Sequence, residues 1–457
     1  MSADSQGKLS LTAKLGWAIG ELGIAVYVGV TMLFFLFYLT EAQGLPPAWA
    51  GLALLLPRLL DAIFDPFMGA ISDRTRSKLG RRRLYVLVGS ILYGAAFCVF
   101  LAMPDFSSQM SKVTFAVIAY IAASFAYSVM TVPYSAMTAE MTTDYRERTE
   151  LVGYRMVAAR LGIIGASVAT PLIYASQASL ADGFRLAGIV LGAFMTVTGL
   201  VTFFTTRDAP RIERPVQSSS IWKELRALTS NQPFVVLFLV FLCQNIAIGA
   251  SATTLVYFLT FAMRADGAVI GPLLTVAGVA ATVFTPPWVL VSKRIGKRPA
   301  YFLSLAIACV MALPAFFLPP SLLPLLFGVY LLSGIGDAGN QLLSNSMVPD
   351  TVEVDELKTG ERREGALFGA WAFCLKCGMA AGAFLVSLVL DLSGFTGGGA
   401  SEQSEAALLG IRISYCIIPF ALWAAAIVLL RFYSLDEARF NEVKGAIQRR
   451  RSGAVHA

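Results

Sequence analysis

Twelve long apolar runs follow one another along this chain, and they constrain its fold more than any other feature. A helix needs about 20 apolar residues to cross the hydrocarbon core of a bilayer, so each run predicts one membrane-spanning helix. Hydrophobic residues make up 56% of the 457 residues and charged residues only 14%, whereas soluble domains carry about 25% charged residues. The sequence therefore predicts an all-α membrane protein with twelve transmembrane helices. The expected spans are 14–40, 48–71, 83–104, 112–137, 150–176, 184–206, 233–262, 267–292, 299–319, 321–348, 364–391 and 408–433.

Lysine and arginine are concentrated in alternate loops, at 72–82, 207–232, 293–298 and 349–363. Basic loops stay on the cytoplasmic side of a membrane, so we expect both termini there, in the cytoplasmic (inner) membrane. The same rule accounts for the net charge of +7, and the chain has no basic domain interleaved with aromatic residues. We therefore expect the lipid bilayer, and no nucleic acid, as a partner.

Loop 207–232 is the longest basic connection, and it divides the spans into two sets of six. The halves repeat weakly: Asp65-Pro66 precedes a basic loop in the first half, and Thr285-Pro286 precedes one in the second. Two such halves are the layout of the major facilitator fold. The expected parts are an N-terminal six-helix half at 1–206, a cytoplasmic linker at 207–232, a C-terminal six-helix half at 233–433, and a tail at 434–457 with an amphipathic helix.

The cysteines and the single histidine give no sign of catalysis or of a bound cofactor. All six cysteines lie in apolar runs, and Cys374-x-x-Cys377 lies within a predicted span, so small apolar packing explains it. The histidine, His456, stands in the tail. Because the sequence contains no recognisable nucleophile–base pair or metal-ligand set, we expect neither an enzyme nor a resident cofactor, only a coupling ion.

Asp61 and Asp65 are the candidate cation-binding residues, and would be metal ligands if the ion is Na⁺. They lie one helical turn apart in an apolar span, with Arg58 one turn before Asp61 on the same face. Charges at membrane depth cost about 2.5–3.5 kcal/mol each on insertion scales, so they usually have a function. The three charges sum to −1, and one Na⁺ or one proton would neutralise them. The residues leave both ions open, as well as a salt bridge that only locks helix packing.

Six further residues are candidates for binding a polar substrate. They share a charged or aromatic side chain inside a predicted span, and they are Glu21, Tyr27, Arg155, Arg160, Trp371 and Lys376. Charged residues in spans mark pathways, and aromatic rings can stack on a sugar. Each has an alternative in helix packing or, for Arg155, in the membrane interface.

Charged residues at the cytoplasmic ends of the spans are candidates for a gating role. The loop after the second span and the acidic-then-basic segment 349–364 carry charges that can pair when the cytoplasmic side is closed and separate when it opens. A carboxylate there can also cap the N-terminus of a neighbouring helix. The candidates are Asp73, Arg74, Arg148, Glu353 and Arg363.

Three segments together resemble the glycoside–pentoside–hexuronide:cation symporter family: RLLDAIFDPFMGAISDRTRSKLGRRR at 58–83, the segment 133–155 with PYSAM and DYRERTELVGYR, and the segment 350–376. The resemblance extends across the twelve spans. It implies that Asp61 and Asp65 are the family's cation-binding pair. It also implies that Lys376 is the lysine of the eleventh helix and that Arg155 lies at or beside the arginine that helps to bind sugar.

The resemblance is incomplete where the family binds sugar. Thr131 stands where the family's best-known member has an Asp, and we expect Thr131 to act as a neutral oxygen ligand of the cation. Ser135 stands where that member has a sugar-stacking Trp, and Ala25 where it has a sugar-binding Asp, although Glu21 is one turn away. These differences argue against a simple galactoside as the substrate.

Together these features predict a cation-coupled secondary active symporter for a sugar, glycoside or uronate, which works by alternating access with Na⁺ or H⁺. Its expected partners are a small-molecule substrate and a monovalent cation, and we expect a monomer. One alternative is a sodium-dependent symporter of a lysophospholipid or another amphiphile. The other is a membrane sensor or receptor that binds without transporting.

Overall fold

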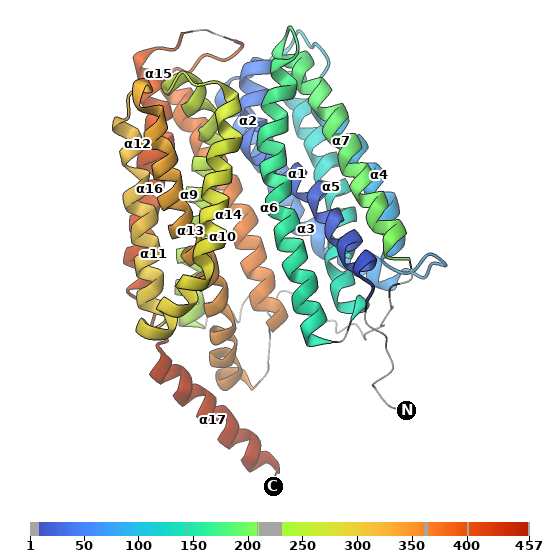
Figure 1. Ribbon diagram of the computed structural model, residues 1–457, viewed down its shortest axis with the longest axis vertical. Helices are drawn as coiled ribbons and strands as arrows, with labels where there is room; N and C mark the ends of the chain where they lie inside the picture. The colour runs from blue at the N-terminus through green and yellow to red at the C-terminus, as the bar shows by residue number, and fades with distance from the viewer. Residues whose placement is uncertain are drawn as a thin grey trace. The chain divides into compact units, whose positions relative to one another are not determined.

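The computed structural model describes residues 9–142, 144–207, 209, 231–360, 364–399 and 402–455. Twelve of its helices are long and apolar enough to cross a membrane (Figure 1). The predicted all-α membrane protein with twelve spans is therefore confirmed. In the first half the spans are α1 (Leu11–Leu33), α3 (Pro47–Arg74), α4 (Arg83–Phe100), α5 (Gln109–Met141), α6 (Tyr145–Ala175) and α7 (Leu180–Thr205).

The second half contains α9 (Gln232–Tyr257), α10 (Ile270–Ile295), α11 (Lys297–Ala312), α13 (Leu323–Thr359), α14 (Glu364–Leu392) and α16 (Ile418–Leu430). With the short elements beside them, the spans that contain α11 and α16 run over Lys297–Phe317 and Glu405–Leu430. Shorter elements extend or join these spans. They are α2 (Phe35–Phe37), the π-helices η1 (Tyr38–Ala42), η2 (Phe258–Ala262) and η5 (Ile413–Ile417), the 3₁₀ turns η3 (Gly267–Val269) and η4 (Pro320–Leu322), α12 (Pro314–Phe317) and α15 (Glu405–Arg412).

Side-chain caps fix where several helices begin. The Ser10 hydroxyl accepts a hydrogen bond from the Ala13 N–H, and the Asp144 carboxylate accepts one from the Glu147 N–H at 2.8 Å. Such caps satisfy N–H groups that have no partner within the helix. The Asp144 cap explains why α6 begins at Tyr145, five residues before the predicted start at 150.

Helix α13 is longer than the sequence predicted. The expected span ended at 348, and 349–363 was expected to be a loop, but the helix continues to Thr359, so the prediction is wrong for 349–359. Pro349 removes one backbone hydrogen bond but does not end the helix, which long membrane helices tolerate. The helix ends at Gly360, whose φ of 77° is left-handed and whose N–H donates to the Glu356 carbonyl.

The chain folds into two compact units. The first contains Met1–Gln217 together with Asp266–Gly271 and Leu390–Ser404, and the second contains the remainder. The segment Leu390–Ser404 thus joins two helices of the second unit but packs with the first. The predicted boundaries at 206, 232 and 433 stay predictions, because residues 210–230 lie outside the described residues.

In the first unit α1 packs against α6 and α7, α4 packs against α5 and α7, and α3 packs against α5. Small side chains allow the closest of these approaches. A Cβ added at Gly16 would lie 1.9 Å from Oγ1 of Thr205, and one at Gly20 would lie 2.6 Å from Oγ1 of Thr202. The Thr202 hydroxyl also donates to the Gly16 carbonyl at 2.9 Å. These contacts form a glycine–threonine seam between α1 and α7.

The second unit repeats the pairings of the first. Helix α9 packs against α16, and α11 packs against α13 and α16, just as α1 packs against α7 and α4 packs against α5 and α7. In each unit a π-helix also lies just after the first long helix: η1 after α1 and α2, and η2 after α9. The weak repeat in the sequence therefore corresponds to a repeat in structure.

The tail forms the predicted helix, α17 (Glu437–Val455), below the second unit in Figure 1. It packs against α13, and Phe440 and Val443 contact the apolar core of the second unit. Ile447 is buried as well. The tail helix therefore covers the end of its own unit.

Candidate ion and substrate site

Two carboxylates project from α3 in the first unit. Asp61 is only 1% exposed, and Oδ2 of Asp61 lies 3.6 Å from Nη1 of Arg58, one turn earlier. The guanidinium of Arg58 is fixed on its other sides, because Nη2 donates to Oγ1 of Thr31 at 3.2 Å and the group lies over the ring of Tyr120. Arg58 therefore places a positive charge beside Asp61 that cannot move away easily.

Asp65 lies one turn further along α3 and contacts α5. The Ser128 hydroxyl donates to Oδ1 of Asp65 at 2.7 Å. Ser128 is fully buried, and Thr131 lies three residues later on the same face of α5. The residue that bonds Asp65 was not predicted from the sequence. Its signal was its place one turn from Thr131.

Glu21 and Arg155 were predicted separately, and the structure brings them together. Nε of Arg155, on α6, lies 2.6 Å from Oε2 of Glu21, on α1. The guanidinium also lies over the ring of Tyr134, which stacks on Trp17. Glu21 is 10% exposed and Arg155 31% exposed, so the guanidinium keeps an open side.

Tyr27 lies on α1 and has no exposed surface. Its ring stacks on Tyr127 with 4.6 Å between centroids, and its hydroxyl lies 3.5 Å from Oγ of Ser124. Arg160 is half-buried on α6, five residues beyond Arg155 and on a different face of the helix. The structure does not bring Arg160 to the Glu21–Arg155 pair.

In the second unit Trp371 and Lys376 lie on α14. The Trp371 indole is 5% exposed and stacks on Phe241 with 3.7 Å between centroids. Its Nε1–H donates to Oδ1 of Asn345 at 3.1 Å, so one face and the edge of the ring are already engaged. Lys376 is half-buried five residues further along.

Asp73, one of the predicted gating residues, lies near the end of the first unit that carries the basic loop 72–82. Asp73 accepts a hydrogen bond from Nη2 of Arg82 at 3.0 Å, and Nε of Arg82 lies 2.8 Å from Glu140. Arg81 also pairs with Glu140. The pairing joins the ends of α3, α4 and α5.

The other gating candidates have separate positions. Arg74 is exposed at the end of α3, and Nη2 of Arg148 donates to the Thr142 carbonyl at 3.2 Å. Glu353 is half-buried on the extended part of α13. Arg363 lies outside the described residues.

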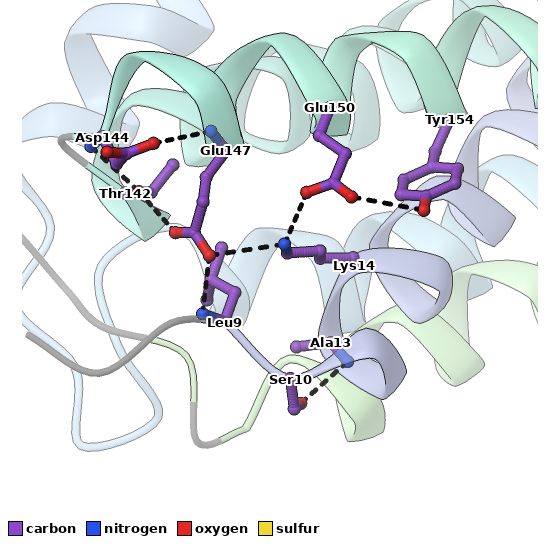
Figure 2. A network of polar contacts seen from close by, with 9 residues as sticks. All are labelled: Leu9, Ser10, Ala13, Lys14, Thr142, Asp144, Glu147, Glu150 and Tyr154. Carbon is purple, nitrogen blue, oxygen red and sulfur yellow. Dashed lines mark hydrogen bonds and ion pairs between the residues drawn. The ribbon is translucent and has the colours of Figure 1, made fainter.

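A polar network that the sequence did not predict joins the start of α1 to α6 (Figure 2). Nζ of Lys14 lies 2.6 Å from Glu150 and 3.3 Å from Glu147. Glu147 also accepts hydrogen bonds from the Leu9 N–H and the Thr142 hydroxyl, both at 2.9 Å. Ion pairs thus hold α1 to α6 at two points. In the Lys14 cluster the cation lies on α1 and the carboxylates on α6, and in the Glu21–Arg155 pair the carboxylate lies on α1 and the cation on α6.

Twelve spans in two repeating units, with ionic groups inside the first, define a multi-pass membrane transporter of the major facilitator class. Residues 16–437 match the family described as MFS/sugar transport protein, and the chain belongs to this family. The resemblance to the glycoside–pentoside–hexuronide:cation symporters is thereby confirmed.

Individual relatives agree with this placement. The chain is 30% identical to the uncharacterized symporter YnaJ of Bacillus subtilis, over 98% of this chain and 97% of that protein. It is 27% identical to a glucuronide carrier protein homologue of Escherichia coli, over 97% of both chains. The crystal structure of a bacterial homologue of the human lysosomal transporter Spinster has a TM-score of 0.68, at 13% identity over 96% of this chain and 97% of that one, which shows the shared fold.

Proposed function

We propose that this chain is a cation-coupled symporter for a sugar, glycoside or uronate, and that it works by alternating access. The observation that carries the proposal is the bond between Ser128 and Asp65. It brings a neutral hydroxyl oxygen onto the Asp65 carboxylate, and hydroxyl and carboxylate oxygens are the hard ligands that Na⁺ prefers. The same carboxylates can bind a proton instead.

Charge balance supports a monovalent ion. Arg58, Asp61 and Asp65 together carry a formal charge of −1, and one Na⁺ or one proton brings them to neutrality. A neutral cluster is less costly to move through a low-dielectric interior than a charged one. One charge moving down 100 mV supplies about 2.3 kcal/mol, enough for roughly fiftyfold accumulation.

The Glu21–Arg155 pair supports a polar substrate. Nε of Arg155 is held by Glu21, which orients the guanidinium and leaves its open side for substrate hydroxyls or a carboxylate. Lys376 is the proposed contribution of the second unit. The glucuronide carrier homologue among the relatives supports the sugar class. The basic loops support a bacterial cytoplasmic membrane with both termini inside.

Uptake by proteoliposomes tests the proposal. We expect accumulation of at least one member of a panel of glycosides, pentosides, uronates and lysophospholipids, driven by a Na⁺ or a pH gradient. Asp61→Asn combined with Asp65→Asn should abolish gradient-driven uptake, whereas Asp182→Asn, which changes an exposed carboxylate, should leave it intact. Unchanged ion dependence in the double variant would overturn the coupling site, and accumulation of lysophospholipid alone would overturn the sugar class.

A further inference from the structure

The π-helix η1 carries a buried carboxylate that the coupling site does not use. Glu41 is 6% exposed and lies between α1 and α3, outside the membrane-spanning segments. Oε2 of Glu41 accepts a hydrogen bond from the Gly399 N–H at 3.2 Å. Oε1 is buried and has no hydrogen-bond partner among the residues that the structure describes. An ionised carboxylate in this position lacks most of the solvation it has in water.

Three consecutive glycines cover Glu41. They belong to the link between α14 and α15, which packs with the first unit. The Gly398 N–H donates to the Thr40 carbonyl at 3.0 Å. A Cβ added at Gly397 would lie 2.3 Å from that carbonyl oxygen and 3.5 Å from Oε1 of Glu41. Only glycine at 397 allows this approach, so the contact is specific to the glycine loop Gly397–Gly399.

Hydrogen bonds within the link hold the described residues around the glycine loop. The Phe395 N–H donates to the Leu390 carbonyl at 3.0 Å, and Nε2 of Gln403 donates to the Thr396 carbonyl at 2.7 Å. A second tether lies nearby, where Oδ1 of Asp391 accepts a hydrogen bond from the Ala48 N–H at 3.4 Å. Among the described residues, the Gly398 and Gly399 N–H groups bond the glycine loop to η1, so releasing the loop breaks these two hydrogen bonds.

Neighbouring charges do not neutralise Glu41. Charged and titratable side chains near η1 and in the link include Tyr38, Lys112, Asp182, Arg185, Asp391 and Glu402. Lys112 donates to the Gln43 carbonyl, Arg185 pairs with Asp182, and Glu402 is exposed. Burial is the dominant influence and raises the pKa of Glu41 from 4.5 to about 7, while the Gly399 N–H acts in the opposite direction.

We propose that Glu41 is a proton-binding site and that its occupancy decides whether the glycine loop docks on η1. When Glu41 is protonated, the neutral acid can stay buried under the loop. When it ionises, the charge gains more from hydration than from the single N–H of Gly399, and the loop leaves. This site lies at the end of the first span that is opposite the basic loops, and it acts without the coupling ion or the substrate.

The direction of the pH effect follows from the two states of the loop. With the loop docked the pKa of Glu41 is about 7, and with the loop released the carboxyl has its ordinary value of 4.5. Docking is therefore strongest below the ordinary value, weakens as the pH rises between the two values, and stays weakest above about 7. The docking constant should fall by on the order of a hundredfold across this range.

Hydrogen exchange of the full chain in lipid nanodiscs tests the proposal. Exchange is followed by mass spectrometry from pH 4 to pH 8, with rates corrected for the chemical exchange of free amides, in peptides that cover 395–399. We expect protection to fall by on the order of a hundredfold as the pH rises, with a midpoint above the ordinary carboxyl value. Protection that does not change with pH, or that falls with a midpoint near 4.5, would overturn the proposal.

Three variants make the test specific. Glu41→Gln is a neutral copy of the protonated acid, and it should keep protection high at every pH. The matched Glu402→Gln, which changes an exposed carboxylate of the same link, should keep the wild-type response. Gly397→Ala should lose protection at every pH, because its Cβ cannot fit against the Thr40 carbonyl. A wild-type pH response in Glu41→Gln, or full protection in Gly397→Ala, contradicts the proposal.

Discussion

The hydroxyl of Ser128 on α5 donates to Oδ1 of Asp65 on α3 across 2.7 Å, and the serine is fully buried. A bound cation would need the lone pairs of both oxygens, so the serine proton would have to turn toward another acceptor. The bond therefore holds the carboxylate in place and gives the proposed ion site a neutral oxygen in direct contact with Asp65.

Replacing Ser128 should weaken cation binding. Ser128→Ala removes a hydroxyl ligand and one hydrogen bond to a charged group, worth about 1.5 kcal/mol, or roughly tenfold in the cation concentration for half-maximal uptake. Ser128→Thr should retain most of the affinity because it keeps the hydroxyl. The control is Ser176→Ala, where an exposed serine bonds only within its own helix end. Equal cation dependence in Ser128→Ala and wild type would contradict the proposed ligand role.

Breaking the Glu21–Arg155 pair from one side should destabilise the first unit. Arg155→Gln leaves the largely buried Glu21 without its cation, and because Arg155 is 31% exposed we expect a loss of about 2 kcal/mol in the free energy of unfolding. Glu21→Gln added to Arg155→Gln should recover most of this stability without recovering transport. Thermal unfolding in detergent measures the first effect, and uptake measures the second. Recovery of transport in the double variant would show that the pair is only structural.

The Lys14 cluster should stabilise the junction of α1 and α6. Lys14→Met keeps the length of the side chain but leaves Glu147 and Glu150 facing each other, for an expected loss of about 1–2 kcal/mol. Lys444→Met, on the exposed face of α17, is the matched control and should change stability by less than about 0.5 kcal/mol. Thermal unfolding of both variants in the same detergent gives the comparison, and equal shifts would argue against a role for the cluster.

The glycine–threonine seam should not accept a single added methyl group. Gly16→Ala would place its Cβ 1.9 Å from Oγ1 of Thr205, which forces the helices apart and should cost about 1–3 kcal/mol. Gly153→Ala, on α6, has nothing within 4 Å of its Cβ and should be neutral or stabilising through helix propensity. Denaturation midpoints measure both. A stabilised Gly16→Ala would mean that α1 and α7 pack differently.

The sequence is most informative where a residue type is rare among its neighbours, as a charged residue is within a membrane-spanning helix. Charged residues stand out in apolar runs, so Asp61, Asp65, Glu21 and Arg155 all became candidate site residues, and their roles stay predictions. The pairing of Glu21 with Arg155 was not predicted, because it depends on the register of two helices more than 130 residues apart in the chain. Spacing along one helix carries no information about that register.

Ser128 and the extension of α13 were missed for other reasons. Serine is common in membrane helices and usually bonds its own backbone, so only its place one turn from Thr131 distinguishes Ser128 from Ser124 or Ser167. For α13, the charges after Pro349 were interpreted as a loop because they end the apolar run. Hydropathy detects where the apolar residues stop, whereas a helix stops where its backbone bonds stop, at Gly360.

The extension of α13 has a mechanical consequence. Residues 349–359 add about 16 Å of helix beyond the predicted span at 1.5 Å per residue. Because α13 is one continuous helix, a small tilt of its part inside the bilayer produces a larger sideways displacement at Glu353 and beyond. Since α17 packs on the same helix, the tail would be carried along with that swing.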